Sequence, residues 1–315
     1  MAYNKFKTHI RKNIRMKLKH VLYLILIISS QLITGCSFSI SSFSDNLGNA
    51  VKANNDTETV IQALPAYLIL LDSLIENDPE DEDLLIASSK LMNAYSALLA
   101  AEIEMLSSED NRNTYYENKL KRQQKKLVKK SLNRISEAIC LYDENLCSIT
   151  SIKYSEFSEK IKNTNSDDIE ILYQLGTSWA SWLQVNTDDW NAMAQLPQIK
   201  LIMKTVNTYD EGWDNAGANM YLGVLNSFIP VTLGGNPEVG KEYFEKAILL
   251  TEGKNQMVKV LYAEYYSRLT FNASLHEKLI TDVLNYEELK DEYTLINTIA
   301  RQKAKALQAS SKDYF

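Results

Sequence analysis

The sequence predicts an all-α fold built as an array of antiparallel helical hairpins. Its 315 residues include only ten glycines and five prolines, and most of these lie where a helix is expected to end. Apolar residues recur at intervals of three and four through most of the chain, which is the spacing of one helical face. No run of alternating Val, Ile and Thr lies between turn residues, so we expect little or no sheet.

The first 35 residues have the pattern of a secretory leader. They contain seven bases and no acid, with a basic stretch at residues 16–20 and an apolar run at residues 21–33. Such a run is typical of a signal peptide, and it is shorter than the ~20 residues of a membrane-spanning helix. We therefore predict a signal peptide over residues 1–35.

The leader ends in the run LITGC at residues 32–36, which resembles the bacterial lipoprotein box. The resemblance implies that Cys36 is acylated and becomes the first residue of the mature protein. Two or more acyl chains on this residue would anchor the protein stably. Ser37 favours the outer over the inner membrane by the usual lipoprotein sorting rule. The alternatives are an ordinary signal peptide that contains a cysteine and a retained anchor helix. Residues 36–55 are predicted to be the acylated cysteine and a serine-rich tether.

The charge of the mature chain argues against one class of partner. Removing the seven bases of residues 1–35 from the 34 in the whole chain leaves 27 bases against 40 acids, a net charge near −13. Nucleic acid requires a dense basic surface on its partner. We expect no nucleic-acid partner.

Residues 56–315 are predicted to form a single all-α domain that begins with a hairpin. Apolar spacing predicts helices at residues 56–76 and 83–106, with a turn near Pro79 between them. A third helical segment carries the bases Lys119, Lys121, Arg122, Lys125, Lys126, Lys129, Lys130 and Arg134. We interpret this block as a solvated helix face, and attraction to anionic lipid headgroups near the anchor is the alternative.

Two cysteines follow the basic block. Cys140 and Cys147 would lie about 10 Å apart in a continuous helix, which is too far for a disulfide. A break of the helix at residues 143–145 would let them bridge, and an oxidising envelope compartment favours a bridge. The sequence leaves both states of this pair open.

All four tryptophans fall within 35 residues: Trp179, Trp182, Trp190 and Trp213. Clustered tryptophans can line an apolar ligand cavity or a partner groove, and Tyr221 is a further candidate for such a site. The interpretation we favour is that these aromatic side chains fill the core of helical repeats.

The clearest hairpin lies at residues 216–248. Pro230 ends its first helix, Gly234 and Gly235 form the turn, and Pro237 suits the first turn of the second helix. Small residues let the two helices approach closely: Gly223, Gly240 and Ala247. Leu-Gly followed by small-x3-aromatic-x2-Ala is the tetratricopeptide-type pattern, whose period is roughly 34 residues. Here an enlarged turn disguises the repeat, so we expect cryptic tetratricopeptide-like repeats.

Groups for catalysis or metal binding are few. His276 is the single histidine after the leader, which disfavours histidine-based metal sites and Ser-His or Cys-His catalysis. The Gly-Gly turn lacks the Lys-Ser/Thr of a phosphate loop. Glu264, which lies between tyrosines, is expected to be hydrogen-bonded rather than catalytic. We predict that the chain binds no metal or cofactor and has no enzymatic activity.

Several runs together resemble the TRAP transporter T-component (TatT) lipoprotein family. They are LYQLG at 172–176, LGGNPE at 233–238, YFEKA at 243–247, VLYAEYY at 260–266 and LINTIA at 295–300. The resemblance covers residues 36–315 and is strongest from residue 169 onward. It implies an all-α fold of cryptic repeats, a lipid anchor facing the periplasm, and a homotrimer with an apolar channel in each subunit. It also implies association with the periplasmic solute-binding protein of a tripartite ATP-independent (TRAP) transporter.

The function expected from these observations is that of a lipid-anchored accessory component of such a transporter. It would bind the solute-binding protein and pass a hydrophobic ligand. The alternatives are a carrier of apolar ligands that works alone and a repeat-type scaffold lipoprotein for envelope assembly.

Overall fold

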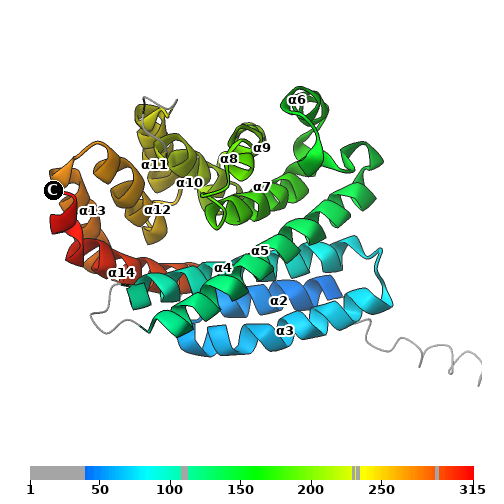
Figure 1. The fold of residues 1–315 in the computed structure, drawn as a ribbon, viewed down its shortest axis with the longest axis horizontal. Helices are drawn as coiled ribbons and strands as arrows, with labels where there is room; N and C mark the ends of the chain where they lie inside the picture. The colour runs from blue at the N-terminus through cyan, green and yellow to red at the C-terminus, as the bar shows by residue number, and fades with distance from the viewer. Residues whose placement is uncertain (1–39, 108–112, 229–230, 232–234, 288–290) are drawn as a thin grey trace, which may run out of the picture. The chain divides into compact units, whose positions relative to one another are not determined.

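We describe a computed structural model of the chain at residues 40–107, 113–228, 231, 235–287 and 291–315 (Figure 1). These residues are mostly helical and contain no strand, which confirms the all-α prediction. The leader, Cys36 and Gly234 lie outside the described residues. Residues Ser44–Phe315 form one compact unit.

The structure has a helix where the sequence predicts a serine-rich tether: α2 spans Ile40–Lys52. Leu47 and Val51 lie four residues apart, which places them on one helical face, and Val51 packs against the hydrophobic core. The prediction relied on serine content and overlooked this spacing.

Helices α3 (Thr57–Asn77), α4 (Glu82–Ser107) and α5 (Thr114–Tyr142) pack in sequence. α3 begins where the Asp56 carboxylate accepts a hydrogen bond from the Thr59 amide at 3.0 Å, which satisfies a free amide of the first turn. Four residues connect α3 to α4. The two predicted helices of this hairpin are therefore present, with ends within a few residues of those expected.

Three serines bring α4, α5 and α7 (Ile169–Gln184) together. The side chains of Ser89, Ser131 and Ser178 are fully buried. The Oγ of Ser89 lies 2.9 Å from the Oγ of Ser131 and 2.9 Å from that of Ser178, and the Gln174 amide donates to Ser89 at 3.0 Å. We call this group the serine junction. Small hydroxyl side chains allow a close approach of helices, and their mutual hydrogen bonds offset the loss of water.

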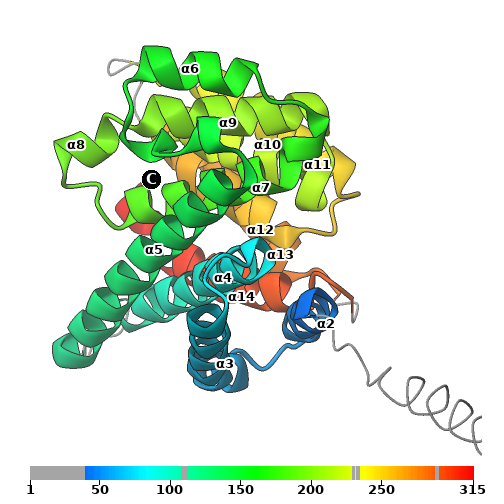
Figure 2. The ribbon, with the colours of Figure 1, turned by 90° about the vertical axis from the view of Figure 1, so that its right-hand side faces the viewer.

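The middle of the chain continues from α5 through two short 3-10 turns, η1 (Glu144–Leu146) and η2 (Ile149–Ser151), to α6 (Tyr154–Lys162). After the 3-10 turn η3 (Ser166–Asp168) and α7 come α8 (Trp190–Met193) and α9 (Leu196–Tyr209). α9 packs against α6, α7 and α10. Figure 2 shows α6 and α9 on the same side of the unit.

Helices α10 (Trp213–Ser227) and α11 (Pro237–Leu250) form the predicted hairpin. Gly223 lies against the Phe244 ring, so that a Cβ atom there would stand 2.7 Å from two ring carbons. A Cβ atom on Gly240 would lie 2.8 Å from the Gly223 carbonyl oxygen. The small residues thus act as close-packing positions, as predicted, and Pro237 starts α11 after the N-cap Asn236. Membership of the tetratricopeptide-type repeats remains a prediction.

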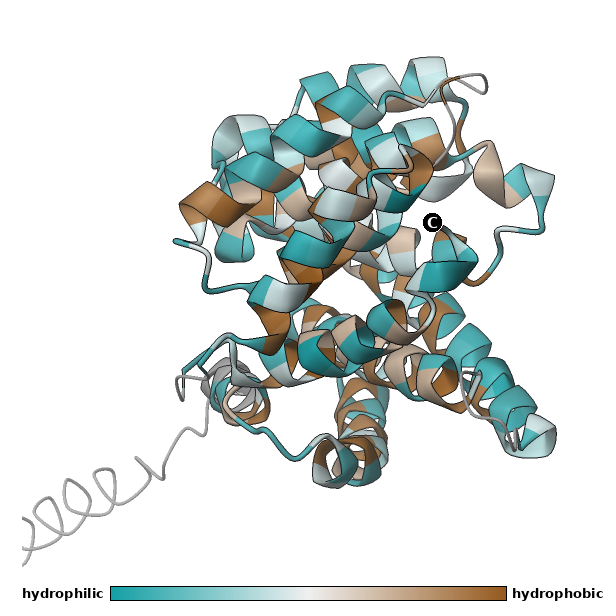
Figure 3. Ribbon diagram, turned by 90° about the vertical axis from the view of Figure 1, so that its left-hand side faces the viewer, coloured by the Kyte–Doolittle hydropathy of each residue, from teal (hydrophilic) through white to brown (hydrophobic). Residues whose placement is uncertain are grey.

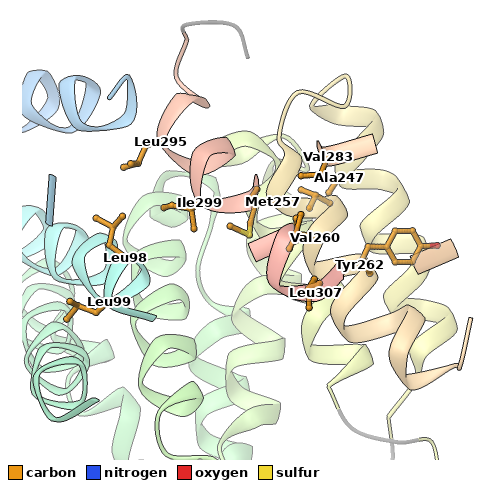
Figure 4. Packing of buried hydrophobic residues seen from close by; sticks show 14 of the residues in the cluster. Leu98, Leu99, Ala247, Met257, Val260, Tyr262, Val283, Leu295, Ile299 and Leu307 are labelled. Carbon is orange, nitrogen blue, oxygen red and sulfur yellow. The ribbon is translucent and has the colours of Figure 1, made fainter. Parts of the chain in front are cut away.

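The C-terminal part consists of α12 (Gln256–Leu261), a π-helical turn η5 (Tyr262–Ser267), α13 (Ala273–Leu284), α14 (Thr294–Ala309) and the 3-10 turn η6 (Ser311–Asp313). α14 packs against α12 and α13 and also against α4. Figure 4 shows Leu98 and Leu99 of α4 in the same hydrophobic cluster as Leu295 and Ile299 of α14. The end of the chain therefore closes onto its first hairpin.

Replacing Gly240 with alanine should lower the free energy of unfolding by about 1–3 kcal/mol, because the added methyl group forces α10 and α11 apart. Urea unfolding followed by circular dichroism measures this loss. Gly48→Ala is the matched control, since Gly48 also lies in a helix and a Cβ atom there meets nothing within 4 Å. Equal midpoints for the two variants would contradict the close-packing role.

Candidate functional site

The four tryptophans differ in how far they are buried. Trp179 is 1% exposed, its indole N–H donates to Gln195 Oε1 at 2.7 Å, and its ring meets Phe157 edge to face at 5.8 Å. Trp190, by contrast, is 87% exposed on α8. Trp179 therefore has the core position that we favoured. Trp182, Trp213 and Tyr221 are half-buried, and their binding role remains a prediction.

A left-handed turn directly follows Trp213. Asp214, Asn215 and Ala216 have φ angles of 44°, 59° and 58°. A left-handed conformation costs a residue with a side chain roughly 1–2 kcal/mol, so three in succession require support from the surrounding structure. The turn lies within the span of α10, and the sequence gives only the weak signal of an Asp-Asn pair, two residues that tolerate positive φ.

Tyrosines surround this turn. The Tyr293 hydroxyl donates to Asn215 Oδ1 at 2.7 Å, and the rings of Tyr173 and Tyr221 meet edge to face at 6.4 Å. Burial raises the pKa of Tyr221 to about 12, and the Asp214 charge adds to this shift. Burial and the same carboxylate hold the pKa of Tyr173 well above its usual value. Both hydroxyls therefore stay protonated at neutral pH and can donate hydrogen bonds.

A second polar group forms at the π-helical turn. The Lys303 ammonium of α14 lies 2.7 Å from Glu104 Oε2 of α4 and 3.1 Å from Glu264 Oε2 of the turn. The exposed fractions of these side chains are 16% for Lys303, 33% for Glu104 and 21% for Glu264. π-Helical turns are often found at functional sites. We call these three residues the charged triad.

Burial and the mutual charges of the three side chains together shift the pKa values in the triad. Burial raises the pKa of the Glu264 carboxyl, although the Lys303 ammonium opposes the shift. Burial acts to lower the pKa of Lys303, but the charges of Glu264 and Glu104 outweigh it and the pKa lies above its usual value. Burial, followed by the Glu264 charge, raises the pKa of the half-buried Tyr265. Glu264 accepts a hydrogen bond from Lys303 at 3.2 Å, which confirms the prediction that it is hydrogen-bonded.

The two polar groups do not form a nucleophile–base pair. Lysine holds the carboxylate of Glu264, and Asp214 lies among protonated tyrosines, with Lys52 Nζ 3.9 Å from its Oδ1. Such groups can bind and orient a polar headgroup or stabilise the helices. Among the residues that the structure describes, no cluster of His, Cys, Asp and Glu could hold a metal ion.

A family model described as TRAP transporter T-component matches residues 53–315. The chain belongs to this family. No curated protein matches the chain. The match spans α3 to the C-terminus, so both polar groups lie inside it, and the resemblance stated from the sequence is confirmed. The family is a transporter accessory component and not a known enzyme family.

The cysteine pair and His276 are further candidates from the sequence that the structure of this T-component describes. Cys140 and Cys147 are joined as a disulfide with a Cα–Cα distance of 4.3 Å, because α5 ends at Tyr142 with Asp143 as its C-cap, where the sequence placed the necessary break. His276 is 2% exposed and packs against the Phe315 ring at 5.1 Å. Burial, with a contribution from Arg268, lowers its pKa, so it is neutral at pH 7.

Two described helices, α3 and α4, are long and apolar enough to cross a membrane by length and composition alone. α4 is mostly buried between α3, α5, α7 and α14, and a buried core helix passes the same test. α3 has the more exposed surface of the two, with 28% of its most apolar window buried.

Lys303→Met should destabilise the protein by about 3 kcal/mol at pH 7, because it leaves Glu264 and Glu104 without their cation. The loss should shrink as the pH falls towards 5. Burial raises the pKa of Glu264 in the folded protein and the Lys303 ammonium opposes that rise, so removing the ammonium should raise the pKa further. The folded variant then binds a proton more tightly than the unfolded chain does, and lower pH favours its folding more than that of the wild type.

Urea unfolding of both proteins at pH 7 and pH 5 measures this effect. Lys305→Met, on the exposed face of the same helix, is the matched control and should change stability by less than about 0.5 kcal/mol. An equal loss for Lys303→Met at the two pH values would contradict the charged triad.

Proposed function

We propose that this T-component is a lipid-anchored periplasmic protein that binds the solute-binding protein of its TRAP transporter. The observation that carries the proposal is the family match over residues 53–315. The ion pairs of the charged triad are consistent with it, because Lys303 binds the carboxylates of Glu104 and Glu264 within the fold. An accessory protein of a transporter needs binding surfaces.

The finer parts of the proposal come from the sequence. Acylation of Cys36 would hold the chain on a membrane of the bacterial envelope, the outer membrane in preference to the inner, with residues 56–315 as a single domain. Association of three copies follows the family resemblance. Mass spectrometry of the N-terminal peptide tests the anchor, and an unmodified Cys36 would exclude it. Light scattering of the purified protein in detergent gives the number of copies in the assembly.

The full-length T-component should retain the purified solute-binding protein of its own transporter with a dissociation constant in the micromolar range, which is ordinary for transient assemblies. Size-exclusion chromatography and calorimetry measure the complex. The control is a periplasmic binding protein from an unrelated transporter, which should not be retained. No complex at about 50 μM of each protein would count against the proposal.

A hydrophobic ligand is the second part of the proposed function, and a specific observation supports it. Aromatic rings on α7, within α10, at the C-cap of α10 and on the π-helical turn are half-buried. They meet in pairs, Tyr173 with Tyr221 at 6.4 Å and Phe228 with Tyr265 at 6.3 Å. Partly accessible aromatic rings beside protonated hydroxyls suit a ligand with an apolar chain and a polar end.

Tyr221→Glu should weaken the binding of a long-chain fatty acid at least about tenfold, because a carboxylate replaces an apolar ring in a partly buried position. Native mass spectrometry with palmitate measures the binding. Tyr115→Glu, at a position that is 77% exposed, is the matched control. Equal binding by the two variants, or no binding by the wild type, would remove the ligand from the proposed function.

A further inference from the structure

The basic block of α5 divides into two sets of side chains. Three bases have acidic partners: Lys121 pairs with Glu117 at 2.5 Å, Lys130 with Asp72 at 2.5 Å, and Arg134 with Asp72 and Glu137 at 3.6 and 3.2 Å. The other five are exposed and form no ion pair with any residue that the structure describes. They are Lys119, Arg122, Lys125, Lys126 and Lys129, and we call them the basic stripe.

The spacing of the basic stripe does not serve the helix itself. Lys119, Arg122, Lys126 and Lys129 follow one another at intervals of three, four and three, so they lie along one side of α5. Like charges at these intervals destabilise a helix by a few tenths of a kcal/mol per pair. A face that is merely solvated usually mixes both signs. The stripe is also opposite in sign to the chain, whose net charge is −6.

The basic stripe lies beside a helix that exposes two large apolar side chains. On α3, Ile69 is 71% exposed and Leu70 is 43% exposed, and Asp72 of the same helix bridges to Lys130 of α5. Figure 3, coloured by hydropathy, shows apolar stretches along α3 and polar residues along α5. The row of bases therefore runs beside Ile69, and Leu70 is exposed further round the same helix.

The two rows are in register. α5 runs antiparallel to α4, because Gln123 bonds to Tyr95 and Ser131 bonds to Ser89. α3 is joined to α4 by only four residues and is therefore also antiparallel to it, so α3 and α5 run in the same direction. Ile69 lies one turn before Asp72, and Lys126 lies one turn before Lys130. The Asp72–Lys130 pair consequently places Ile69 at the level of Lys126.

Apolar side chains beside a run of lysine and arginine are the pattern of a surface that lies on a membrane. Each base near an anionic bilayer contributes about 1 kcal/mol of attraction, and the neighbouring apolar side chains can enter the headgroup region. We infer that the outer face of α3 and α5, with the basic stripe and Ile69 and Leu70, docks on a bilayer of anionic phospholipid. This inference rests on the proposed lipid anchor, which would hold the chain at such a bilayer.

Lysine acetylation of the full-length protein on vesicles tests the docking. The protein is reconstituted on vesicles of phosphatidylcholine alone, or of phosphatidylcholine with phosphatidylglycerol as about a third of the lipid, and the modified lysines are identified by mass spectrometry. Labelling of Lys119, Lys125, Lys126 and Lys129 should fall at least about threefold on the anionic vesicles, and roughly 0.5 M salt should restore it. Lys278 and Lys305, exposed on α13 and α14, serve as internal controls and should label equally on both.

A pair of charge-reversal variants sharpens the test. Arg122→Glu with Lys126→Glu should abolish the protection of Lys119 and Lys129, whereas Lys278→Glu with Lys305→Glu should leave it intact. Equal labelling on both kinds of vesicle, with the protein floating with both, would overturn the docking and leave the anchor standing. Flotation with the anionic vesicles alone would support the docking and contradict the anchor, and flotation with neither would contradict both. Protection that requires added solute-binding protein instead of anionic lipid would assign the face to that protein and overturn the inference.

Discussion

The close approach of α4, α5 and α7 at the serine junction is the constraint on which the rest of the structure depends. Ser89, Ser131 and Ser178 share hydrogen bonds of 2.9–3.2 Å in a fully buried position, where a larger side chain would separate the helices. α4 also carries the charged triad's Glu104 and packs against α14. A shift of this one helix would therefore disturb the first hairpin, the middle helices and the C-terminal helices together.

The fold class and most helices could be predicted from the sequence, because the apolar spacing of a helix is a local property. The hairpin of Gly223 and Gly240 was predictable for the same reason, since small residues at helical spacing have a direct steric meaning. The family was also recognisable from short runs. Helix α2 was overlooked because a high serine content drew attention away from the spacing of Leu47 and Val51.

The candidate site was much less predictable, because it depends on pairs of residues that are far apart in the chain. Glu104 and Lys303 are 199 positions apart, and no local pattern joins them. The serine junction consists of polar residues that would be expected on the surface from composition alone. The left-handed turn at Asp214 and the π-helical turn at Glu264 depart from regular backbone geometry, which helical periodicity cannot reveal. The tryptophans, which were prominent in the sequence, differ in burial, since Trp179 is buried and Trp190 is exposed.

The π-helical turn has a consequence for how the C-terminal part can vary. A π-helical turn closes its hydrogen bonds over one residue more than an α-helical turn does, so it fits one extra residue into the helix without turning the residues on either side. Deleting one residue from Tyr262–Ser267 would therefore leave a regular helix, and Arg268, which donates to Ser310 at 2.8 Å, would keep its face. The same deletion inside a regular helix such as α13 would rotate every following residue by roughly 100°. The π-helical turn is thus a place where this part of the chain can lose one residue and keep the contacts of the helix beyond it.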